Sequence, residues 1–286
     1  MFKEIISFKA VIIACSILLS YMFVSCDSSD SQARQLLSQA NSAFQSGQYT
    51  SAITLLDSLK KNYPTDIDAQ KSAMYLRTLA DEQIIIRQIQ ENDSALVNSE
   101  KNVAAMIQKF TFIKDTDMVE GYTVNNSAKT NPLVNRTGLE ARIDERANLY
   151  LVSLLNGNKA NHDRVEVVNG VEFATTEAVP YNGSSNYRFN VAGVNNEMVT
   201  FRGGKADTLC MFVANNRNAK LKINFIGDKK ISQPLSASDA KAIADTYQYA
   251  RALQTNREAN DMKKYLDAKL QITRQQKDKT AKYAPK

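Results

Sequence analysis

The chain has 286 residues, a net charge of +6 at neutral pH, one histidine, three cysteines and no tryptophan. A zinc centre needs three or four ligands of histidine, cysteine or carboxylate type in a suitable pattern, and three scattered cysteines give no disulfide framework, so we expect no metal site and no cofactor. The length is enough for two modest domains or one elongated body.

The first 26 residues have the pattern of an export signal. Lys3 and Lys9 precede an apolar segment at residues 10–24, which is shorter than the roughly 20 apolar residues of a membrane-spanning helix. A basic start followed by a short apolar segment is typical of a secretory signal. The segment ends in the sequence FVSC at residues 23–26, after which the chain becomes polar.

This FVSC sequence resembles the lipobox of bacterial lipoproteins, with phenylalanine at the position where leucine is usual. The resemblance implies that residues 1–25 are a signal peptide and that Cys26 carries acyl chains, palmitate among them, which anchor the protein in a membrane. Residues 26–32 would form a tether. An ordinary cleaved signal and an uncleaved N-terminal anchor are the alternatives.

Acidic residues directly after the cysteine carry sorting information in lipoproteins, and Asp27 and Asp30 lie in this stretch. Such residues keep some lipoproteins at the inner membrane and direct others to the outer membrane or the cell surface. We expect an outer-membrane lipoprotein, on either the periplasmic or the surface face. A location in the cell envelope excludes nucleic acid as a partner.

Residues 33–64 are predicted to form a helical hairpin. Apolar residues recur at helical spacing on both sides of a turn at Gly47, and Pro64 ends the second helix. Small residues at Ala40 and Ala52 allow the two helices to approach closely.

The hairpin resembles one tetratricopeptide repeat over about 32 residues, and the matching positions are Ala40, Gly47, Tyr49, Ala52, Leu56, Leu59 and Pro64. The next segment does not continue the series, although a solenoid of such repeats normally needs three or more. The resemblance implies binding of a protein partner in the envelope. A helical hairpin without a ligand is the alternative.

Two long amphipathic helices are predicted, from residue 66 to about 112 and from about 236 to 281. Ser236 or Ser238 would cap the second helix. We expect the two helices to pair antiparallel as a coiled-coil-like stalk, and the alternative is that each packs separately on the middle of the chain. The last 24 residues carry eight basic and two acidic side chains, which fits either a solvated helix end or contact with an anionic surface.

The segment between these helices changes to a period of two and has the pattern of a β-domain. Around the dipeptide Asn169-Gly170, apolar and polar residues alternate on both sides, which predicts a hairpin with a type I′ turn. Further strands are predicted at YRFNV, EMVTF, TLCMFVA and KLKINFIG. About seven short strands indicate an antiparallel sandwich.

The predicted fold is therefore α+β. A hairpin and long helix at residues 33–117 precede a sandwich-like β-domain at 118–235, and a helix with a basic tail follows at 236–286. The β-domain would be an insertion between the two helices of the stalk.

Candidate catalytic groups are few. His162 lies in a predicted loop, whereas Cys210 lies in the predicted strand TLCMFVA, where a buried thiol behaves as a small apolar group, so we do not expect a His–Cys pair. Asp144 and Glu145 are interpreted as a solvated, ion-paired edge. Since no convergent polar set is visible, we predict that the protein is not an enzyme.

The sequence favours a non-catalytic envelope lipoprotein that acts as a scaffold or protein-interaction module. The alternative is a lipoprotein that binds carbohydrate or peptidoglycan through its β-domain. That alternative requires an aromatic platform on one sheet face, supplied by tyrosines, and the tyrosine-containing loop VPYNGSSNYRF at residues 179–189 has a suitable composition.

Overall fold

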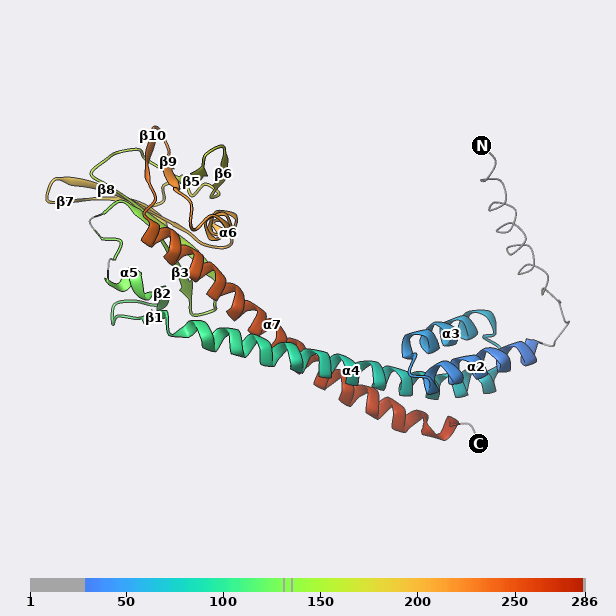
Figure 1. Cartoon of the computed structure of the whole chain (residues 1–286). Helices are drawn as coiled ribbons and strands as arrows, with labels where there is room; N and C mark the ends of the chain where they lie inside the picture. The colour runs from blue at the N-terminus through green and yellow to red at the C-terminus, as the bar shows by residue number, and fades with distance from the viewer. Residues whose placement is uncertain (1–28, 131, 135, 285–286) are drawn as a thin grey trace, which may run out of the picture. The chain divides into compact units, whose positions relative to one another are not determined.

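The computed structural model describes residues 29–130, 132–134 and 136–284. The fold is mixed α+β, as predicted, with long helices and two antiparallel sheets (Figure 1). The described residues divide into two compact units: residues 29–89 with 266–284, and the described part of residues 90–265. No helix within the described ranges combines the length and the apolar character required to cross a membrane.

The first unit contains the predicted helical hairpin. Helices α2 (Ser29–Gln45) and α3 (Tyr49–Asn62) are followed by the start of α4 (Ile67–Ile107). Asp66 caps α4, because its Oδ1 accepts a hydrogen bond from the backbone N–H of Ala69 at 2.9 Å. The core of this unit contains mainly alanine and leucine: Ala33, Ala40, Leu56, Leu59, Ala69, Ala73 and Leu76.

In the same unit, the first half of α4 pairs with the end of α7 (Ala237–Thr280). The carboxylate of Glu82 accepts hydrogen bonds from Arg274 at 3.0 Å and from Lys277 at 2.6 Å. The hydroxyl oxygens of Thr78 and Thr280 lie 3.2 Å apart. Two cations of the basic tail therefore pair with a buried carboxylate.

In the second unit, the other halves of α4 and α7 also pair. Asn92 donates a hydrogen bond to the carbonyl of Ala259, and Asn256 donates one to the hydroxyl of Ser99. The residue numbers of the contacting partners increase along α4 while they decrease along α7, so the two helices are antiparallel. The expected pairing of the two long helices is thus present in each unit.

The strands of the second unit form two sheets in which every pairing is antiparallel. The six-stranded sheet has the order β1-β2-β3-β4-β8-β7, and the four-stranded sheet has the order β10-β9-β5-β6. The strands are β1 (Phe110–Ile113), β2 (Tyr122–Asn125), β3 (Gly138–Asp144), β4 (Leu149–Asn156), β5 (Arg164–Asn169), β6 (Glu172–Thr175), β7 (Asn186–Val191), β8 (Val194–Phe201), β9 (Lys222–Ile226) and β10 (Lys230–Pro234). A short helix, α5 (Asn126–Thr130), follows β2.

One apolar core joins the two sheets. Leu151 and Phe201 from the larger sheet and Val165 and Phe225 from the smaller sheet all belong to it. Helix α6 (Asp207–Asn215) and the beginning of α7 complete this core. Both sheets are therefore buried on one face against each other and the helices, as in the predicted sandwich-like arrangement.

The structure corrects the prediction for TLCMFVA, which is not a strand. These residues lie in α6, where the fully buried Leu209, Cys210 and Val213 occupy one helical face. A short apolar run fits a buried strand and a buried helix equally well, so its periodicity could not distinguish the two.

Two local boundaries also differ from the prediction. Helix α4 ends at Ile107, and Phe110 begins β1, so the helix does not reach residue 112. In the β5–β6 hairpin, Asn169 pairs with Glu172, which places Gly170 and Val171 in the turn. Gly170 has φ +63° and Val171 has no positive φ, which fits a type II′ turn with glycine first rather than type I′. Of the two predicted caps, Ser236 and Ser238, the structure shows Ser236, whose hydroxyl accepts a hydrogen bond from the backbone N–H of Asp239.

Candidate functional site

A groove of about 400 Å³ lies in the first unit between one face of α2 and one face of α4. Its apolar lining consists of Leu37 and Phe44 from α2 and Tyr75, Leu76 and Leu79 from α4. Leu37 and Phe44 are two helical turns apart, and Tyr75 and Leu79 are one turn apart, so each helix presents one stripe of side chains to the groove. The volume lies within the range of about 300–1,000 Å³ that is usual for ligand pockets.

The rim of this groove is polar, with Arg34, Ser38, Asn41 and Gln45 along α2 and Ser72 on α4. Arg34 is the single charged residue among those that line the groove. An apolar floor with amide donors and one cation suits a partner that presents apolar side chains next to a carboxylate.

The residues that carried the repeat-like resemblance do not line this groove; they belong to the hairpin whose first helix forms one side of it, or directly follow that hairpin. Ala40 and Ala52 are fully buried, and Ala40 and Leu56 belong to the core of the first unit. Gly47 adopts φ +73° in the turn, a conformation that favours glycine. Tyr49 packs on Phe44 with a ring-centroid distance of 5.5 Å. Pro64 follows the end of α3, and Cys26 lies outside the described residues.

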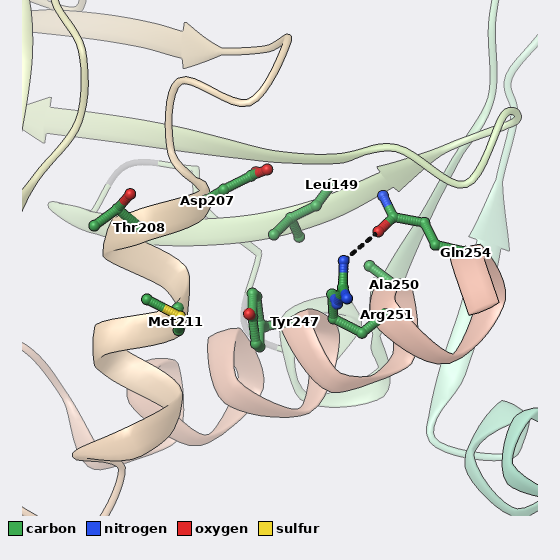
Figure 2. Close-up of a pocket in the computed structure, with 8 residues that line it drawn as sticks. All are labelled: Leu149, Asp207, Thr208, Met211, Tyr247, Ala250, Arg251 and Gln254. Atoms are coloured by element: carbon green, nitrogen blue, oxygen red, sulfur yellow. Dashed lines mark hydrogen bonds between the residues drawn. The ribbon is translucent and has the colours of Figure 1, made fainter. Parts of the chain in front are cut away.

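A second concave site, of about 250 Å³, lies in the other unit (Figure 2). It is lined by Leu149 at the start of β4, by Asp207, Thr208 and Met211 on α6, and by Tyr247, Ala250, Arg251 and Gln254 on α7. Figure 2 shows the Asp207 and Arg251 side chains on different elements, with Leu149 and Tyr247 between them. Arg251 donates a hydrogen bond to the side-chain oxygen of Gln254 at 3.2 Å.

Three polar side chains meet inside the β-domain in a serine–histidine–carboxylate arrangement that the sequence did not predict. The Nδ1 atom of His162 lies 2.8 Å from Oε2 of Glu197, and its Nε2 atom lies 2.8 Å from the hydroxyl of Ser153. A neutral ring that donates to the carboxylate through Nδ1 accepts the serine proton at Nε2. The order is that of a nucleophile, a base and an orienting acid.

The Glu197 carboxylate also holds the loop that carries His162. Its oxygens accept hydrogen bonds from the backbone N–H groups of Ala160, Asn161 and His162 at 2.7–2.9 Å. Burial raises the pKa of Glu197, but the hydrogen bonds from the side chain and backbone of His162 and from the backbone of Asn161 outweigh it and lower this pKa to about 2. The carboxylate is therefore ionised at neutral pH.

This trio is closed to solvent. Ser153 and His162 are fully buried and Glu197 is 2% exposed. The rings of His162 and Phe225 pack edge to face at a centroid distance of 5.2 Å. Because a nucleophile must reach its substrate, this geometry favours a structural role in fixing the loop after β4 over catalysis.

A weak signal of this trio was present in the sequence. Glu197 pairs with Leu155 and alternates with Val199 and Phe201, so a charged residue occupies a position where the strand pattern requires an apolar one. Its partner could not be found from the sequence, because His162 is 35 residues away in a loop.

Neither a family model, nor a curated protein sequence, nor a solved structure matches this chain. The resemblances to a lipobox and to a tetratricopeptide repeat consequently depend on the residues quoted for them.

The other candidate residues from the sequence lie in the buried core, in a turn and in a surface ion pair. Cys210 is a fully buried free thiol on α6, and burial raises its pKa. Asp144 accepts hydrogen bonds from the backbone of Arg146 and Asn148 in the turn after β3. Glu145 pairs with Lys114 at 2.8 Å. No group of three or more metal-ligating side chains occurs within the described residues.

Proposed function

We propose that this protein is a non-catalytic cell-envelope lipoprotein, anchored through Cys26, that binds a protein partner in the groove between α2 and α4. The observation that supports the partner site most directly is the groove, with its floor of Leu37, Phe44 and Leu79. Exposed polar side chains at Asn41 and Gln45 can form hydrogen bonds with a polypeptide backbone along the rim.

The partner that suits this groove is a polypeptide segment with two or three apolar side chains and an adjacent aspartate or glutamate. The apolar side chains would fill the floor, where their burial contributes about 25 cal/mol per Å² of apolar surface. The carboxylate would pair with Arg34, the charged residue of the lining. An interaction of this kind fits the helix-in-groove mode of peptide recognition.

Photocrosslinking in intact cells tests this proposal. A benzoylphenylalanine at Asn41, which lines the groove, is expected to capture a protein partner. The same group at Gln39 is the control, because Gln39 is exposed on α2 and does not line the groove. Arg34→Glu should reduce capture at Asn41. Equal capture at both positions, or capture that is insensitive to Arg34→Glu, would contradict the groove as the contact site.

The anchor is tested separately by Cys26→Ala. The lipoprotein proposal predicts that this variant leaves the membrane fraction and that the wild-type protein carries labelled palmitate. A variant that stays in the membrane unprocessed would support an uncleaved N-terminal anchor instead.

A glycan-binding function of the β-domain is the second candidate, because an exposed ring, Phe189, and a half-buried one, Tyr187, lie on its edge strand. Tyr187 and Phe189 of β7 are two residues apart on one face, with ring centroids 5.5 Å apart and an interplanar angle of 26°. Tyr181 is also exposed and lies under Arg188. Retention on insoluble cell-wall polysaccharide that is lost in Phe189→Ala but kept in Arg34→Glu would favour this function.

A further inference from the structure

The site in Figure 2 carries two opposite charges that form no ion pair with each other. Asp207 begins α6 and Arg251 lies on α7, and both line the same concavity. Within the described part of the chain, the Asp207 carboxylate has no hydrogen-bond or ion-pair partner. Arg251 has a neutral partner, the side-chain oxygen of Gln254.

The electrostatics of Asp207 agree with this arrangement. Partial burial raises its pKa, and the charge of Arg251 opposes that rise. Arg251 therefore lies close enough to act on the carboxylate without bonding to it. A ligand cation beside Asp207 would compensate for the loss of water around the carboxylate.

Between the two charges the wall is apolar or weakly polar. Leu149 and Ala250 form one part of it, and Met211 and the ring of Tyr247 form another. The volume of about 250 Å³ is below the range of drug-sized pockets, so the site suits a molecule with about ten non-hydrogen atoms.

We propose that this site binds a small zwitterion with an apolar side chain, of the size of a free amino acid. Its carboxylate would accept hydrogen bonds from the guanidinium of Arg251, which can bind a carboxylate through two N–H groups. Its ammonium group would pair with Asp207, and its side chain would contact Leu149 and Met211.

The two charges together select this ligand class. A simple anion would meet the repulsion of Asp207, and a simple cation would meet that of Arg251. A neutral apolar molecule would leave both charged groups partly desolvated and unpaired, which is unfavourable. This binding site is separate from the groove of the first unit, so it does not depend on the proposed partner.

The test is calorimetric titration of the full-length protein in detergent with L-leucine, N-acetyl-leucine and leucinamide. Leucine carries both charges, whereas each analogue lacks one. The proposal predicts saturable binding of leucine and an affinity at least about tenfold lower for each analogue, since each analogue loses one charge-assisted hydrogen bond. Absence of leucine binding, or equal binding of leucine and N-acetyl-leucine, would overturn it.

Variants of Arg251 and Asp207 test which group of the ligand each residue binds. Arg251→Gln should lower the affinity for leucine at least about tenfold and change the affinity for leucinamide little, because leucinamide lacks the carboxylate. Asp207→Asn should also lower the affinity for leucine at least about tenfold, and it should change the affinity for N-acetyl-leucine little, because that analogue lacks the ammonium group. Arg257→Gln is the matched control, because Arg257 is an exposed arginine on the same helix that does not line the site. Its leucine affinity should be that of the wild type.

Since both replaced residues are exposed, folding should be preserved, which thermal unfolding will check. If either variant unfolds early, titration of the wild-type protein with the three ligands still decides the proposal. Equal losses of leucine affinity in all three variants would overturn the assignment of the site.

Discussion

His162 and Glu197 form a buried pair in which the imidazole Nδ1 lies 2.8 Å from a carboxylate oxygen. The same carboxylate accepts three backbone hydrogen bonds from residues 160–162, so it determines the path of the chain between β4 and β5. Asn186 supports this path from β7, because its side-chain amide donates to the carbonyls of His162 and Val179.

Glu197→Gln is expected to destabilise the protein by about 3 kcal/mol at pH 7, the free energy that corresponds to a pKa lowered from 4.5 to about 2. A lowered pKa gives a contribution that is complete above pH 4.5 and is lost as the pH falls through 2. Urea unfolding of the wild type should therefore show a loss of stability between about pH 5 and 2 that is smaller in the variant.

The control for this experiment is Glu177→Gln, which changes an exposed carboxylate paired with Lys205 at the surface. Its unfolding free energy should stay within about 0.5 kcal/mol of the wild type. A pH dependence that is identical in the wild type and in Glu197→Gln would show that this carboxylate does not hold the loop.

Ala52→Leu should destabilise the first unit by about 1–3 kcal/mol, because Ala52 is fully buried on α3 and a larger side chain overpacks the hairpin. Thermal unfolding monitored by circular dichroism measures the effect. Ser51→Leu is the control, since Ser51 is exposed on the same helix. An unchanged unfolding temperature for Ala52→Leu would rule out close packing at this position.

Glu82→Gln should weaken the pairing of α4 with α7 by about 1–2 kcal/mol, because two charge-assisted hydrogen bonds become weaker ones and Arg274 is already half-exposed. The hydrogen bond from Lys277 lowers the pKa of Glu82 against the opposing effect of burial, with a further hydrogen bond from Arg274. The difference in stability between the wild type and Glu82→Gln should therefore become smaller at acidic pH, because the wild-type carboxylate becomes protonated.

Hydrogen exchange of the amides in residues 266–280 reports this pairing locally. Protection should fall in Glu82→Gln and remain in Glu91→Gln, whose carboxylate is exposed on the same helix. Equal protection in both variants would mean that the ion pairs contribute nothing to the contact.

Cys210 should resist alkylation in the folded protein, because its thiol is fully buried on α6 and burial raises its pKa. Iodoacetamide treatment followed by mass spectrometry of the peptide that contains Cys210 gives the measurement. Modification should become complete in guanidinium chloride. Rapid modification under native conditions would show that α6 opens readily.

The sequence alone was sufficient for features that local interactions decide. The helical spacing around Ala40 and Ala52 predicted the hairpin, and the pair Ser236 and Ser238 predicted the start of the last helix to within two residues. Alternation in residues 164–175 predicted the β5–β6 hairpin. In each case the relevant residues are neighbours in the chain, so backbone preferences and side-chain periodicity carry the information.

Only the tertiary structure decided features that depend on distant residues. The run around Cys210 became a helix because its apolar face packs into the core shared by the two sheets. Ser153, His162 and Glu197 met because β8 pairs with β4 across 35 or more intervening positions. The sequence predicted that the two long helices pair, with separate packing as the alternative, and contacts such as Thr78 with Thr280, 202 residues apart, confirm the pairing. Burial and long-range pairing are properties of the folded chain, and local sequence patterns do not encode which distant side chains will meet.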